Sequence, residues 1–170
     1  MNIAAAKIAL VAFAVALAST ARAQDLKLIG EAGQVVSLAP ADIAALPHVA
    51  LKVQVEGKAV AFGGAPLSSI LARVGAPYGP ALRGPALADV VIIKARDGYT
   101  VALALAETDP AFRKDQVILA DSADGASLPD TAGPYRLVVE GDLRAARSAR
   151  MVVSIEVRRL SAAAGSQVKP

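Results

Sequence analysis

Arginine is concentrated in one stretch near the C-terminal end of the sequence, between Gly133 and Leu160. The stretch has no lysine and contains Arg136, Arg144, Arg147, Arg150, Arg158 and Arg159. Arginine is a fixed cation with a planar fork of N–H donors, which suits a phosphate, a carboxylate or the edge of a polar heterocycle. The pattern favours an anion or polar-ring site. The alternative is a solvent-exposed hairpin whose charges protect its edge.

Other residue types exclude several kinds of chemistry. The chain has no cysteine, so no thiolate is present for catalysis or for binding a metal. His48 is the one histidine, which is too few for a histidine-based zinc site, and we expect it on the surface. Asp121, Asp124 and Asp130 lie in one predicted loop, but their spacing lacks the alternating ligands of a calcium-binding EF-hand loop.

Short strands and a few helical turns must position the arginines. Alternating or β-branched runs predict strands at 35–38, 50–55, 59–62, 90–95, 99–103, 116–120, 135–140 and 151–160. Helical spacing predicts helices at 40–47 and 67–74, the second ended by Gly75. Gly63-Gly64 is expected to break the strand before the second helix, and Asp97-Gly98 predicts a hairpin turn. The predicted class is α+β, mainly β, in a single domain.

The N-terminal segment has the pattern of an export signal. Lys7 precedes an apolar run from Ile8 to Ala18, and Ala21-Arg22-Ala23 follows as a small-x-small motif. We therefore expect a signal peptide over residues 1–23, cleaved after Ala23, and a periplasmic protein; an uncleaved anchor is the alternative. The domain is predicted over residues 24–160 and a flexible tail over residues 161–170. Without the segment, 16 cations face 15 acids, so nucleic acid is not an expected partner.

Six motifs in order resemble the oxidoreductase molybdopterin-binding domain family, which has the sulfite oxidase fold. The resemblance extends over about residues 26 to 160. Its motifs are Phe62–Leu71 with Gly75, Asp97-Gly98-Tyr99, Ile118–Ala120 with Gly125 and Leu128-Pro129, Gly133–Val139, Arg147–Arg150, and Ile155–Val157. The resemblance implies a sulfite oxidase-like fold with mixed sheets and a few short helices.

The resemblance also implies a binding site. In the family, an Arg-Ser-x-Lys-Trp segment helps to hold the pterin cofactor and its phosphate; this segment is Arg147-Ser148-Ala149-Arg150-Met151 here, with methionine in place of tryptophan. The expected cofactor-binding residues are Arg147, Arg150, Ser148, Tyr99, Asp97 and Tyr135, with a tyrosine as the stacking face. For Asp97 a role in the turn is the stronger alternative. Arg158 and Arg159 are expected on an outer strand as ordinary surface charges.

The sequence departs from the family at the metal. Enzymes of the family bind molybdenum through the cofactor and one cysteine, which should lie within 49–58, and that segment has none. The residues thus favour a protein that is not an enzyme and that holds a pterin or molybdopterin-like ligand without molybdenum.

Three functions stay open. The first is an exported binding protein for a pterin-like small molecule, which signals to a periplasmic domain of a membrane protein. The second is a molybdopterin-dependent oxidoreductase, or its accessory subunit, without the cysteine ligand. The third is a structural or adaptor domain whose arginines pair with Glu140, Asp142 and Glu156.

Overall fold

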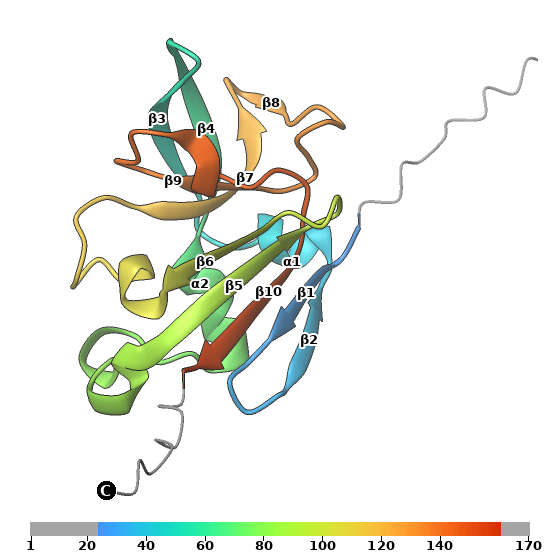
Figure 1. The fold of residues 1–170 in the computed structure, drawn as a ribbon. Helices are drawn as coiled ribbons and strands as arrows, with labels where there is room; N and C mark the ends of the chain where they lie inside the picture. Colours follow the sequence, from blue (N-terminus) through green and yellow to red (C-terminus); the bar gives the residue numbers. More distant parts are fainter. Residues whose placement is uncertain (1–23, 161–170) are drawn as a thin grey trace, which may run out of the picture.

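The computed structural model describes residues 24–160, in which two β-sheets lie one above the other and a hairpin projects from the upper sheet (Figure 1). The strands are β1 (Leu26–Ile29), β2 (Val35–Leu38), β3 (Val49–Val55), β4 (Lys58–Pro66), β5 (Asp89–Ala95), β6 (Thr100–Ala104), β7 (Val117–Ala123), β8 (Ala126–Ser127), β9 (Arg136–Val139) and β10 (Val152–Arg159). The helices are α1 (Pro40–Ala44) and α2 (Leu67–Leu71), with 3₁₀ turns η1 (Ala72–Val74), η2 (Gly79–Ala81), η3 (Gly84–Ala88), η4 (Leu105–Thr108) and η5 (Ala145–Arg147).

The first sheet has the strand order β2-β1-β10-β5-β6. Its central strand, β10, runs parallel to β1 and antiparallel to β5, so the first and last strands of the described chain lie side by side (Figure 1). Ile155 of β10 stands opposite Leu28 on one side and Ile93 on the other, and all three side chains are buried. The expectation that Arg158 and Arg159 lie on an outer strand was therefore wrong, because β10 has a partner strand on each side.

The second sheet has the order β3-β4-β7-β8, and β9 also pairs with β7. The prediction that Gly63-Gly64 would end the strand was wrong, because β4 continues through both glycines to Pro66. A Cβ at Gly64 would overlap the Leu119 carbonyl oxygen on β7. Glycine thus allows the two strands to approach closely where their pairing register shifts.

Two apolar clusters stabilise the fold. The main core lies between the sheets and includes Leu28, Ile93 and Leu137. A smaller cluster, which includes Phe62 and Val138, lies on the other face of the second sheet. Because side chains alternate along a strand, β9 contributes Leu137 and Val139 to the main core and presents Arg136 and Val138 to the second cluster.

The predicted class, α+β and mainly β, is confirmed. The helix predicted at 67–74 forms as α2 followed by η1, and Gly75 ends it with a left-handed φ of 70°. Strands β1 and β8 and the turns η2 and η3 were not predicted from the sequence. The predicted signal peptide and C-terminal tail lie outside the described residues. Within 24–160, no helix is long and apolar enough to cross a membrane.

Candidate functional site

A cavity of about 930 Å³ opens at one end of the two sheets. The start of β1, helix α1, the β5–β6 turn, strand β7 and the segment between β8 and β9 all contribute to its wall. Its polar lining consists mainly of Arg96, Asp121, Ser122, Ser127, Asp130 and Tyr135. We call it the Tyr135 cavity. Its volume lies within the range of pockets that bury small organic ligands.

Tyr135 is the one predicted binding residue that lines this cavity. Its side chain packs with the main core and the residue is only 4% exposed. Burial, followed by the negative charges of Asp121 and Asp25, raises the pKa of the phenol to about 12. The hydroxyl is therefore protonated at neutral pH and available as a donor, while the ring supplies an apolar wall.

Asp121 is held on one side by His48. The Nε2 atom of His48 lies 2.9 Å from a carboxylate oxygen of Asp121, and its Nδ1 atom lies 2.7 Å from the Leu46 carbonyl oxygen. Both partners accept hydrogen bonds, so a doubly protonated ring satisfies both contacts, whereas a neutral ring donates to one of them. The hydrogen bond to Asp121, and then that to Leu46, raises the pKa of His48.

Arg147, the residue expected to bind the cofactor, is engaged within the protein. Its Nε and Nη2 atoms donate to the two carboxylate oxygens of Asp142 at 2.9 and 2.6 Å, and its Nη1 atom donates to Glu107 at 2.9 Å. These hydrogen bonds, to Asp142 first and then Glu107, raise the pKa of the guanidinium. Arg147 thus joins the β9–β10 connection to η4.

The other predicted binding residues lie in the β5–β6 turn and in the β9–β10 connection. Asp97 accepts a hydrogen bond from the Tyr99 N–H at 2.9 Å, which is the turn role that the sequence favoured. The Tyr99 hydroxyl donates to the Ala146 carbonyl oxygen at 2.7 Å, so this turn contacts the connection that carries Ser148. Ser148 accepts a weak hydrogen bond from the Val139 N–H at 3.4 Å. Arg150 is exposed, and its positive charge helps to lower the pKa of Arg136.

The expectation that Arg159 is an ordinary surface charge was wrong. Its Nε atom donates to Asp89 at 2.7 Å, and its Nη2 atom contacts both Asp89 and Glu31. Asp89 is fully buried. Arg158, by contrast, makes an exposed pair with Glu156, one of the pairs that the structural alternative expected.

Arg136 differs from the paired arginines. The residue is 6% exposed, and its Nε atom has no hydrogen-bond partner within the described chain. Its guanidinium carbon lies 4.9 Å from the centre of the Phe62 ring, a cation–π arrangement. Burial, and then the charge of Arg150, lowers the pKa of Arg136. A hollow of about 20 Å³ borders Arg136, Asp142 and Ser148.

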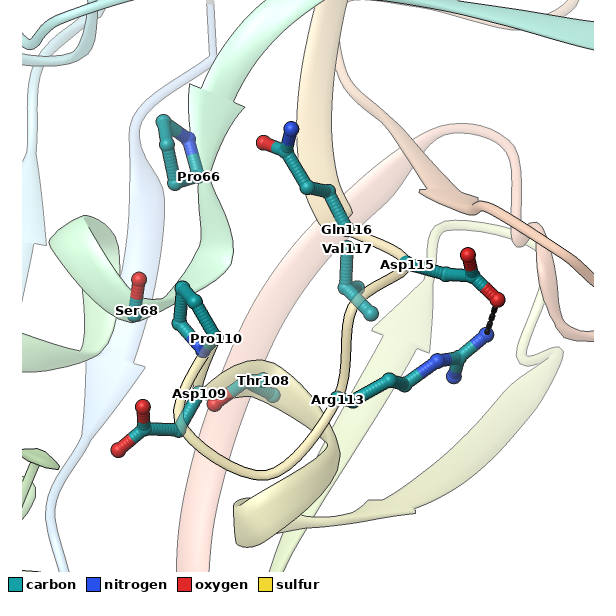
Figure 2. A pocket seen from close by; sticks show the side chains of 9 residues that line it. All are labelled: Pro66, Ser68, Thr108, Asp109, Pro110, Arg113, Asp115, Gln116 and Val117. Carbon is teal, nitrogen blue, oxygen red and sulfur yellow. Dashed lines mark ion pairs between the residues drawn. The ribbon is translucent and has the colours of Figure 1, made fainter.

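A second small hollow lies beside the segment between η4 and β7 (Figure 2). It measures about 20 Å³, which is space for a water molecule rather than for an organic ligand. Asp109 at its wall already accepts hydrogen bonds from the N–H groups of Gly79 and Ala111, at 2.6 and 2.8 Å. Figure 2 shows Arg113 turned towards Asp115, its partner at 4.0 Å. This hollow is therefore too small for an organic ligand, and the hydrogen bonds of Asp109 stabilise the surrounding loop.

Residues 18–164 match the family described as the oxidoreductase molybdopterin binding domain. The chain belongs to this family. Among solved structures, the sulfane dehydrogenase SoxCD from Paracoccus pantotrophus is similar, with a TM-score of 0.60 and 19% sequence identity. The match covers 79% of this chain but only 38% of the matched chain, and it supports the sulfite oxidase-like fold. A comparison with curated proteins found no match.

The family implies a molybdopterin-type cofactor, and the residues present do not fit its metal. The sequence has no cysteine, and residues 24–160 hold no group of three or more histidine, aspartate or glutamate side chains that could bind an ion. The hollow beside Arg136 and Ser148 is far smaller than a pterin. The hollow beside the Arg136 side chain has room for a small acceptor, whereas the Tyr135 cavity has room for a heterocycle.

Sequence reasoning missed Arg96, Asp121 and Asp130 as members of one site. They come from the β5–β6 turn, β7 and the segment after β8, which the fold brings together. The sequence offered one signal, the three aspartates of 121–130, and these were considered only as calcium ligands. Arg96 directly precedes the Asp97-Gly98 turn, so its place at the cavity depends on how that turn meets the second sheet.

Proposed function

We propose that this protein is an exported, non-enzymatic member of the family that holds a pterin-like heterocycle in the Tyr135 cavity without molybdenum. The observation that carries the proposal is the cavity itself. Its volume of about 930 Å³ combines a buried tyrosine with carboxylates and a guanidinium. Pockets for small molecules have this composition, with apolar walls and a few placed polar groups.

The lining matches the functional groups of a pterin. The pyrimidinone edge of a pterin presents an amino group and a ring N–H side by side, and a carboxylate accepts two such donors together. Asp121 and Asp130 supply carboxylates at the wall, and one oxygen of Asp121 is already bonded to His48. Arg96 supplies donors for a ring carbonyl. The Tyr135 hydroxyl, which is protonated at neutral pH, is a further donor at the wall.

A molybdopterin-dependent oxidoreductase, or an accessory subunit of one, is the second candidate. The family match favours it. The donor set argues against it, because enzymes of the family bind molybdenum through one cysteine thiolate of the protein and this chain has no cysteine. Elemental analysis of the purified protein separates the two candidates, since only the oxidoreductase retains molybdenum in amounts equimolar with the chain.

Export and signalling are part of the same proposal. Residues 1–23 have the sequence pattern of a signal peptide, which supports a periplasmic location. Sequencing the N-terminus of protein from the periplasmic fraction should return Gln24 as the first residue. The proposed signalling partner is a periplasmic domain of a membrane protein, and crosslinking in the ligand-bound state should capture it. A cytoplasmic protein with residues 1–23 intact contradicts the proposed export and signalling.

Fluorescence titration with neopterin tests binding directly. The wild-type protein should quench neopterin fluorescence in a saturable manner. Asp130→Asn should weaken binding at least tenfold, because an amide replaces one carboxylate oxygen with a donor; about 1.4 kcal/mol corresponds to that factor. Asp115→Asn changes an acid outside the cavity and is the matched control. No saturation with the wild-type protein, or equal affinity in both variants, contradicts the proposal.

A further inference from the structure

Arg136 is a buried cation without a partner of opposite charge. Its Nε atom is inaccessible to water and unbonded, and no ion pair within residues 24–160 includes its guanidinium. The same stretch contains arginines that are fully paired, such as Arg147 and Arg159. An uncompensated buried charge is strongly unfavourable, so a counter-ion is expected beside Arg136.

No side chain within residues 24–160 supplies that counter-ion. Asp142 borders the same hollow as Arg136, but both of its carboxylate oxygens accept hydrogen bonds from Arg147. Phe62 offers only the face of its ring. Arg150 is a second positive charge close enough to disfavour the charged form of Arg136. The local electrostatic potential beside the hollow is therefore positive.

The hollow sets the size of the ion. Its volume of about 20 Å³ is close to the space that one water molecule needs. Two side chains at its wall can donate to an anion, the guanidinium of Arg136 and the hydroxyl of Ser148, whose oxygen is bonded to the Val139 N–H only weakly at 3.4 Å. Larger oxyanions such as sulfate do not fit such a space.

We propose that this hollow is a binding site for a small monovalent anion of the chloride type, held by Arg136 and Ser148 on the outer face of the second sheet. The site is separate from the Tyr135 cavity, because neighbouring residues of a strand face opposite sides of the sheet. Binding of the anion neutralises Arg136 and stabilises the folded chain. The inference does not depend on the proposed function.

Thermal unfolding of the full-length chain in sodium chloride and in sodium gluconate, at equal ionic strength, tests the site. An anion that binds only the folded state raises the midpoint by about 4 °C for each tenfold increase in its concentration above Kd. The wild-type protein should show this rise in chloride relative to gluconate. Sulfate should give no such rise, and a larger effect of sulfate than of chloride contradicts a water-sized site.

Arg136→Met is the decisive variant because methionine has a similar length and brings no charge into the apolar cluster. This variant should lose the difference between chloride and gluconate, and in chloride-free buffer it should be at least as stable as the wild type. Arg158→Met, which removes an exposed arginine, should retain the chloride effect. Broadening of the chlorine-35 resonance by wild-type protein, absent with Arg136→Met, is an independent measurement. Equal midpoints in both salts for the wild type, or a chloride effect that persists in Arg136→Met, overturn the proposal.

Discussion

Replacing Arg147 with alanine should destabilise the protein, because its guanidinium is a structural link. The change removes three hydrogen bonds, two to Asp142 and one to Glu107. Asp142 keeps only 15% of its side chain exposed and would lose its cation. Breaking a fully buried ion pair costs about 3 to 5 kcal/mol, and an exposed pair is worth about 0 to 1 kcal/mol. Arg147 is 37% exposed, so we expect a loss between these limits, at about 2 kcal/mol.

Urea unfolding followed by circular dichroism measures this loss. The midpoint should fall for Arg147→Ala with little change in the slope, and Arg147→Lys should restore only part of the stability because lysine cannot make the two-point contact. Arg158→Ala, which removes an exposed ion pair, is the control and should shift the midpoint far less. If Arg147→Ala retains wild-type stability but loses bound ligand, Arg147 acts in ligand binding and the structural interpretation is wrong.

Two further predictions concern charged pairs. Arg159→Ala leaves the buried carboxylate of Asp89 without its cation, so the urea midpoint of this variant should fall. Adding Asp89→Asn to Arg159→Ala should recover part of the loss. Equal midpoints for Arg159→Ala and the wild type contradict the pairing. The pKa of His48 is raised above its ordinary value of 6.5 in the folded state. Its pairing with Asp121 therefore stabilises the fold fully at pH below 6.5, and this stabilisation is lost as the pH rises through the folded-state pKa. His48→Gln should flatten that part of the stability profile, and an unchanged profile contradicts it.

The elements with strong local signals could be predicted from the sequence. The β-branched run at 90–95 and the apolar alternation at 152–159 became the paired strands β5 and β10, and Gly75 ended its helix as expected. Strand β1 was missed because its four residues carry too short a pattern. Its partner is β10, more than a hundred residues away, so its place in the sheet depends on tertiary pairing.

Residue type alone does not predict which arginines are paired within the protein. Composition marked the stretch as a site for anions or polar rings, and it could not distinguish Arg136 from Arg147. The difference depends on distant partners: Glu107 reaches Arg147 from η4, whereas Arg136 lies over Phe62 on β4. Tyr135 was selected as a stacking residue, and it does line the large cavity, but the acids around it come from other elements.

Analysis of what the purified protein carries tests the central claim most directly. Protein from the periplasm should be denatured in acid, and the released material should be examined for pterin fluorescence while the same sample is analysed for molybdenum. We expect a fluorescent pterin, no molybdenum, and loss of the pterin from Asp130→Asn with the fold intact. Molybdenum equimolar with the chain, or an empty protein that also takes up no neopterin on titration, would contradict it.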